Sequence, residues 1–139
     1  MARRILSVIA GLLVAMVVIT GVEAVIPLLY PVPPGLDMKD PAAFKVYVAA
    51  LPIGALLMVI LAHSLGALVG AVVATLIAGR ASIWPGMIVG ALVMVAGIVN
   101  LFQISHPVWF SVVDLLLYLP AAYGGARLML KRPAAAPGG

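Results

Sequence analysis

The chemistry open to this sequence rests on a few polar side chains that fall within long apolar runs: Glu23, His63, Asn100 and Asp114. A carboxyl, imidazole or amide group is costly to bury in hydrocarbon, so such a group usually has a partner or takes part in a function. At about 100° per residue, His63, Asn100 and Asp114 each share a helical face with glycine and alanine residues. Faces of small residues turn toward neighbouring helices, so we expect these polar groups to point into the interior of a helix bundle.

The depth of each group in the membrane follows from counting residues along a helix at about 1.5 Å each. This count puts Glu23, Asp114 and Asn100 in one layer, in the outer half of the membrane. His63 falls deeper, near the middle, and we expect it to lie out of direct reach of that layer. The candidate site is therefore a buried polar layer with two residues at its outer mouth: Glu23, Asp114, Asn100 and His63 in the layer, and His106 and Lys45 at the mouth.

Three kinds of site fit this layer. The first is a structural layer in which protonated carboxyls, or a carboxylate paired with Lys45, fix the register of the helices. The second is a proton-coupled or cation-binding site, because two neighbouring carboxyls do not both ionise readily and one can take up and release a proton. The third is a divalent metal site in which His63 or His106 joins the two carboxylates, although no tight spacing such as H-x-x-x-H is present. We favour the first, and we predict no metal site and no cofactor.

The composition is that of a membrane protein. Of the 139 residues, 65% are hydrophobic and only 9% are charged, whereas soluble domains carry about 25% charged residues. The sequence has no cysteine, which removes disulfides, thiolate metal sites and thiol redox chemistry. The net charge of +4 comes from basic residues at the ends of apolar runs, so we expect no nucleic-acid partner and predict the lipid bilayer as the surroundings.

The apolar runs predict one all-α domain, an integral membrane four-helix bundle over residues 1–130, and a disordered cytoplasmic tail over residues 131–139. The expected membrane spans are about 5–29, 46–78, 84–102 and 107–130. Pro52 predicts a kink or break where the second helix enters the membrane. The first span begins like a secretory signal peptide, but its apolar run is longer than that of a normal signal peptide, so we expect a retained helix.

The orientation in the membrane follows from the basic residues. In a four-helix arrangement one side carries six of them: Arg3, Arg4, Arg80, Arg127, Lys131 and Arg132. The other side has only two lysines, offset by two aspartates: Lys39, Lys45, Asp37 and Asp40. The positive-inside rule then predicts a multi-pass protein of the bacterial inner (plasma) membrane with both termini in the cytoplasm, N-in and C-in.

The second span carries a ladder of small residues at four-residue spacing: Ala62, Gly66, Gly70, Ala74 and Ala78. Such a row lets two helix backbones approach closely, which is how membrane helices associate. We expect the ladder to pack within the bundle first, since each helix must find its own neighbours. The same small-residue faces are the expected contact with a protein partner or with further copies of the chain.

No catalytic motif is present: the sequence lacks G-x-S-x-G, a Walker loop and H-E-x-x-H, and we predict no enzymatic activity and no catalytic residues. The predicted function is therefore a packing or interaction role, as an accessory subunit of a membrane complex. The alternative is a proton-linked small-molecule or cation transporter or sensor that uses the buried carboxyls.

Several elements, in order along the chain, carry a resemblance to known proteins: Glu23, Tyr30 to Asp40, Leu51 to Leu57, Asn100 and Leu101, His106 to Phe110, and Leu119 to Ala122. In this order they resemble an uncharacterised family of small four-helix bacterial inner-membrane proteins. The resemblance covers nearly the whole chain and implies the fold without implying an activity.

A second, partial resemblance is to the small multidrug resistance transporters, which have four helices and a glutamate in the first. Here Glu23 is flanked by a different motif and lies nearer the helix end. The strong charge bias of this chain also favours one fixed orientation, in contrast to the dual-topology antiparallel dimers of that family.

Overall fold

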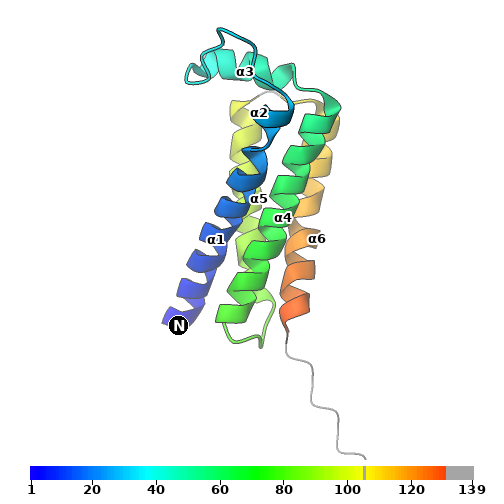
Figure 1. The fold of residues 1–139 in the computed structure, drawn as a ribbon. Helices are drawn as coiled ribbons and strands as arrows, with labels where there is room; N and C mark the ends of the chain where they lie inside the picture. Colours follow the sequence, from blue (N-terminus) through cyan, green and yellow to red (C-terminus); the bar gives the residue numbers. More distant parts are fainter. Residues whose placement is uncertain (105, 131–139) are drawn as a thin grey trace, which may run out of the picture.

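The computed structural model describes residues 1–104 and 106–130, and within these ranges the chain is helical without a strand. The helices are α1 (Ala2–Glu23), α2 (Ile26–Leu29), α3 (Pro41–Ala49), α4 (Ile53–Ile77), α5 (Trp84–Gln103) and α6 (Val108–Met129). Four segments are long and apolar enough to cross a membrane: Ala2–Leu29, α4, α5 and α6. Figure 1 shows them side by side as a bundle, with α3 lying across one end. The predicted all-α membrane bundle is confirmed, and the predicted tail over 131–139 lies outside the described residues.

Helix α4 is the centre of the bundle and packs against α1, α5 and α6. Its contact with α1 is a direct approach of backbones at two glycines. A Cβ atom on Gly70 would lie 2.7 Å from the carbonyl oxygen of Gly11, and one on Gly11 would lie 2.6 Å from that of Gly70. No side chain larger than hydrogen fits at this crossing, which is why small residues occur on both helices.

The other small residues of the bundle interior also contact helices of the same chain. Gly66 on α4 lies against Ile19 of α1. A Cβ atom on Gly86 of α5 would lie 2.9 Å from Ala126 of α6, and Gly125 of α6 touches the backbone of Leu68 on α4. The ladders therefore hold this bundle together, as the intramolecular interpretation of the sequence expects.

The first predicted span, residues 5–29, is interrupted near its end. Helix α1 ends at Glu23, and the short α2 begins at Ile26 with Pro27 in its first turn. Proline has no N–H group, so Pro27 cannot donate to the carbonyl oxygen of Glu23 four residues earlier. The break leaves Glu23 as the last residue of α1, within the end of the bundle nearest α3 (Figure 1).

The second predicted span, residues 46–78, is divided in two. Asp40 caps the start of α3 by accepting a hydrogen bond from the Ala42 backbone N–H at 3.0 Å, and α3 ends at Ala49. Pro52 then precedes α4, which begins at Ile53, about seven residues later than predicted. Helix α3 is instead held over the bundle end, where the Tyr47 hydroxyl donates to the Tyr30 carbonyl oxygen at 3.0 Å.

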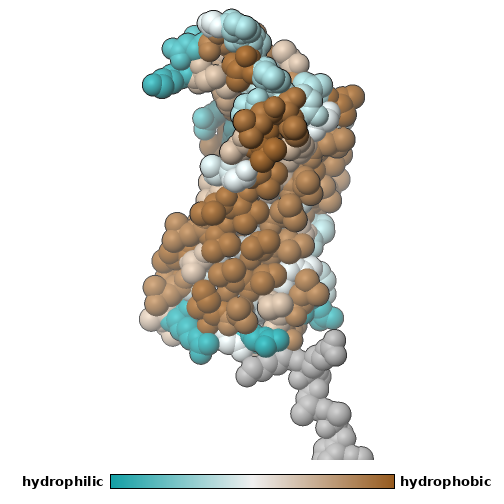
Figure 2. Space-filling model, in the orientation of Figure 1, coloured by the Kyte–Doolittle hydropathy of each residue, from teal (hydrophilic) through white to brown (hydrophobic). Residues whose placement is uncertain are grey.

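The N-terminus and the end of α6 lie at the opposite end from α3 (Figure 1). Two arginines satisfy helix-end carbonyls there, since Arg3 Nε donates to the Ile77 oxygen and Arg80 Nε to the Met129 oxygen, both at 2.6 Å. Figure 2 shows the lateral surface as hydrophobic and both ends as hydrophilic. This distribution is that of a protein surrounded by lipid along its sides.

Candidate functional site

His63 is the centre of the polar interior, because each of its ring nitrogens faces a carboxylate from a different helix. Its Nδ1 atom lies 2.8 Å from Asp114 Oδ1 on α6. Its Nε2 atom lies 3.4 Å from Glu23 Oε1 at the end of α1. The imidazole on α4 thus joins the two carboxylates, which reach it from opposite sides of the bundle interior.

Tyr118 completes the cluster. Its hydroxyl donates to Asp114 Oδ2 at 3.2 Å, and its ring stacks on that of His63 with centroids 5.5 Å apart. Asp114 is only 2% exposed and Tyr118 only 1% exposed. A spacing of four residues on α6 puts both side chains on one face, toward α4 and α5. Both Asp114 oxygens therefore have a partner, as a carboxylate buried this deeply requires.

A glycine on α5 makes the room for Tyr118. A Cβ atom on Gly97 would lie 2.8 Å from Cζ of Tyr118 and would meet its hydroxyl oxygen more closely still. Any larger residue at this position would push the phenol away from Asp114. The glycine therefore holds the site open, in addition to its role in helix packing.

The arrangement of the cluster limits its proton content. With no proton on the carboxyls and a neutral imidazole, only one ring nitrogen of His63 could donate, and the lone pair of the other would face a carboxylate. One further proton on the imidazole lets both ring nitrogens of His63 donate to a carboxylate. It also changes the net charge of the cluster from about −2 to about −1. A second neutralises the cluster. In a bilayer, where net charge is costly, the cluster is suited to hold and exchange protons.

His63 lies closer to the carboxylates than the sequence indicates, and the expectation that it is out of direct reach is wrong. The residue count that gave the depth of His63 assumed a second helix that enters the membrane near Val46. Because α4 starts at Ile53, His63 is only about 15 Å below the helix end by the same rise of about 1.5 Å per residue. Asp114 lies about 9 Å below the start of α6 at Val108, and one His63 side chain spans the remaining difference.

Glu23 is the part of the cluster that reaches open space, since its side chain is 39% exposed whereas that of His63 is 10% exposed. Two cavities meet at it. The inner one, of about 200 Å³, is also lined by His63, Tyr118 and Asn100. The outer one, of about 410 Å³, is lined by Glu23 and Asn100 and continues under α3. The site is therefore accessible from the α3 end of the bundle.

The remaining predicted residues have separate positions. Asn100 lines both cavities beside Glu23, and within the described residues its side chain makes no hydrogen bond. His106 lines the outer cavity, where its Nδ1 lies 2.8 Å from the Ile104 carbonyl oxygen and its ring stacks on Phe110. Both residues thus belong to the approach to Glu23 rather than to the hydrogen-bonded cluster.

Lys45 does not join the site. It is exposed on α3 and lines a different cavity, together with Lys39. Within residues 1–104 and 106–130, the ion pairs of Glu23 and of Asp114 are both with His63. Among the described residues Lys45 therefore pairs with neither carboxylate, since it lies on α3, which crosses the end of the bundle (Figure 1).

The side chains of Glu23, His63, Asp114 and Tyr118 follow one another in a row and do not surround a common point. The described part of the chain contains no group of three or more His, Asp or Glu side chains that could hold a metal ion. Both His63 nitrogens already face carboxylates, so neither lone pair is directed at a shared centre. This geometry fits proton transfer along the row better than coordination of a divalent ion.

The candidate site drawn from the sequence leaves out Tyr118, although Tyr118 shares the helical face of Asp114, and it does not include the two cavities. The spacing of Asp114 and Tyr118 was the available signal for the tyrosine, since residues four apart share a helical face. The cavities depend on side chains from several helices and on the position of α3, for which the sequence carries no local pattern.

Comparisons of this chain with protein-family models, with curated proteins and with solved structures give no match. The resemblances noted from the sequence therefore stay predictions.

Proposed function

We propose that this protein is a small proton-linked transporter or sensor that binds a cation or a small cationic molecule at Glu23. One observation carries the proposal: His63 contacts both Glu23 and Asp114, and Glu23 alone of the three extends into a cavity that continues under α3. A purely structural polar layer would have no need of a half-exposed carboxylate at the meeting point of two cavities.

The linkage follows from charge. A cation in the outer cavity is attracted to the Glu23 carboxylate and competes with the His63 N–H group for the same oxygen atoms. Adding a positive charge to the cluster favours loss of a proton, since the low-dielectric surroundings penalise a change in net charge. Cation binding and proton release are thereby coupled, and the hydrogen-bonded partners Asp114 and Tyr118 hold His63 in place during the exchange.

The lining of the outer cavity favours an organic cation. Phe44 and Tyr47 of α3 line it opposite Glu23, together with apolar side chains of α2 and α4. Aromatic faces attract ammonium groups, especially quaternary ones that carry an apolar surface. A quaternary ammonium ion such as tetramethylammonium is therefore the first probe, with sodium and potassium ions beside it.

The side from which the ligand enters is also part of the proposal. The end of the bundle where α1 begins carries Arg3, Arg4, Arg80 and Arg127, whereas the α3 end has Lys39, Lys45 and two aspartates. The positive-inside rule supports both termini in the cytoplasm of a bacterial cell and α3 on the outer side of the inner membrane. The cavity would then take its ligand from outside the cell.

The role of an accessory subunit ranks second. Its main support in the sequence was the small-residue ladders, and these contact helices of the same chain. A protein partner would have to bind elsewhere, on the exposed lateral surface or on α3.

Reconstitution into vesicles that enclose a pH-sensitive dye tests the proposal. An inward gradient of tetramethylammonium, sodium or potassium should change the internal pH, and a proton gradient should change cation uptake. Glu23→Gln and Asp114→Asn should abolish the response, whereas Asp37→Asn, in the loop before α3, should retain it. An equal response of the Glu23→Gln and unaltered proteins would overturn the proposal. A cation-dependent proton release in detergent without flux in vesicles would favour the sensor.

A further inference from the structure

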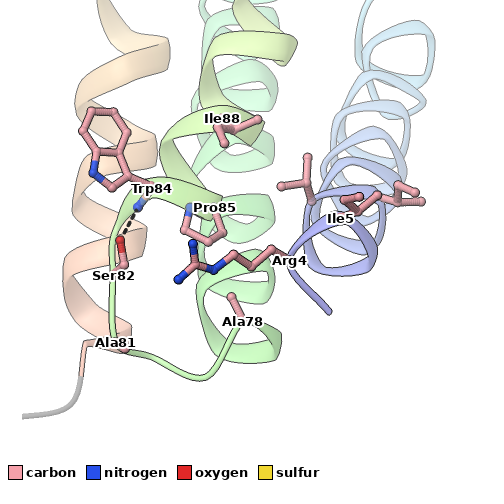
Figure 3. Close-up of a pocket in the computed structure, with 10 residues that line it drawn as sticks. Arg4, Ile5, Ala78, Ala81, Ser82, Trp84, Pro85 and Ile88 are labelled. Atoms are coloured by element: carbon pink, nitrogen blue, oxygen red, sulfur yellow. Dashed lines mark hydrogen bonds between the residues drawn. The ribbon is translucent and has the colours of Figure 1, made fainter. Parts of the chain in front are cut away.

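A separate cavity of about 500 Å³ lies at the opposite end of the bundle from α3, between α1, the loop after α4 and the start of α5. Its walls are mainly aliphatic, and its three isoleucines are about half exposed: Ile5, Ile9 and Ile88, at 57%, 49% and 46%. Two polar side chains, Arg4 and Ser82, also line it. Figure 3 shows Arg4 extending from α1 toward Ser82 and Pro85.

Arg4 differs from the other described arginines at this end of the bundle. Arg3 and Arg80 each donate to a helix-end carbonyl oxygen, and Arg127 lies over the Tyr123 ring at 5.8 Å from its centroid. Within residues 1–104 and 106–130, the Arg4 guanidinium has no hydrogen bond, ion pair or aromatic contact. Arg4 thus differs from Arg3, Arg80 and Arg127 in having no such partner among the described residues.

The chain supplies no carboxylate side chain to pair with Arg4. The sequence has four acidic residues, of which Glu23 and Asp114 belong to the buried site and Asp37 and Asp40 precede α3. All four lie away from the cavity that Arg4 lines. An anion for this arginine must therefore come from outside the described chain.

Ser82 provides a second donor. Its Oγ atom accepts a hydrogen bond from the Trp84 backbone N–H at 3.3 Å, which leaves its own O–H group free to donate (Figure 3). An anion between Arg4 and Ser82 would thus receive a charge-assisted hydrogen bond and a hydroxyl hydrogen bond. A small soluble anion would satisfy both donors but would leave the isoleucines of the cavity uncovered.

We propose that this cavity binds an anionic phospholipid, with its phosphate between Arg4 and Ser82 and an acyl chain between α1 and α5. A phospholipid has the required order of groups, because its phosphate lies at the membrane surface and its acyl chain enters the hydrocarbon. Trp84, 68% exposed beside the cavity, lies at the level where tryptophan side chains favour the membrane interface. The site is independent of the proton-linked function at Glu23.

Fluorescence of Trp84 gives a local test. The chain has two tryptophans, and Trp109→Phe removes the one at the α3 end. In non-ionic detergent, phosphatidylglycerol with brominated acyl chains should quench Trp84 at a lower mole fraction than phosphatidylcholine with the same chains. Arg4→Gln should raise the mole fraction of phosphatidylglycerol needed for half-maximal quenching about tenfold, because it removes one charge-assisted hydrogen bond. Arg127→Gln, at the same end but away from the cavity, is the matched control and should leave it unchanged.

A second variant tests the acyl-chain part of the proposal without a change in charge. Ala81 lines the cavity and is exposed, so Ala81→Phe should fill part of it and weaken quenching while the helical circular dichroism stays intact. Equal quenching by the two lipids would overturn the proposal. An equal loss for Arg4→Gln and Arg127→Gln would also overturn it, since general surface charge would then account for the binding. Competition by inorganic phosphate, with no effect of Ala81→Phe, would indicate a soluble anion in place of a lipid.

Discussion

The Nδ1 atom of His63 and the Oδ1 atom of Asp114 are 2.8 Å apart across the interface of α4 and α6. The contact joins the central helix of the bundle to its last helix, and it fixes which ring nitrogen remains for Glu23. The same pair therefore supports the fold and sets up the half-exposed carboxylate at the cavity. Its two roles can be separated by experiment.

A double-mutant cycle measures the coupling of His63 with Asp114. His63→Gln and Asp114→Asn should each lower the free energy of unfolding in detergent by about 1–3 kcal/mol, since each leaves a buried polar group without its charged partner. The double variant should lose less than the sum by at least about 0.5 kcal/mol. A cycle with His106→Gln and Asp37→Asn should be additive, because these side chains do not contact each other. Additivity in both cycles would mean that the His63–Asp114 contact contributes nothing.

Two glycine variants test the packing of Tyr118 against Gly97. Gly97→Ala should destabilise the protein by about 1–3 kcal/mol, because the added methyl group overlaps the Tyr118 ring. It should also reduce proton-linked activity by moving the phenol from Asp114. Gly124→Ala on α6 is the control, since a Cβ atom there meets nothing within 4 Å. Thermal unfolding that ranks the two variants equally would argue against the packing described for Gly97.

The orientation can be tested cleanly because the chain contains no cysteine. In intact bacterial cells, an impermeant thiol reagent should label Asp37→Cys, in the loop before α3, and spare Ala81→Cys, in the loop after α4. After the cells are broken, both variants should react. The reverse pattern in intact cells would put the α3 end in the cytoplasm, and labelling of both would indicate two orientations.

The fold was accessible from sequence because its main signals are local. Four long apolar runs suffice to predict four spans, and Pro52 marks the break before α4. The effect of Pro27 was harder to foresee, because only the structure shows that the helix ends at Glu23 and resumes at Ile26. Helix boundaries depend on which hydrogen bonds the surrounding turns can replace.

The site was only partly accessible, for a reason that is also physical. Sequence spacing identified His63, Asn100 and Asp114 as polar groups facing the interior, and the residue count put Glu23 in one layer with Asp114. Their contacts depend on where each helix starts relative to the others, and an error of about seven residues at Ile53 moves His63 by about 10 Å along the bundle axis. Cavities are harder still, because they are set by small differences in packing among several helices.

In the proposed function, a cation that binds at Glu23 displaces a proton from the Glu23–His63–Asp114 cluster. The most direct measurement adds tetramethylammonium, sodium or potassium chloride to the purified protein in weakly buffered non-ionic detergent and follows a pH indicator. We expect a saturable release of protons from the unaltered protein and from Asp37→Asn, and none from Glu23→Gln. Absence of release from the unaltered protein with all three salts, or equal release from Glu23→Gln, would contradict it.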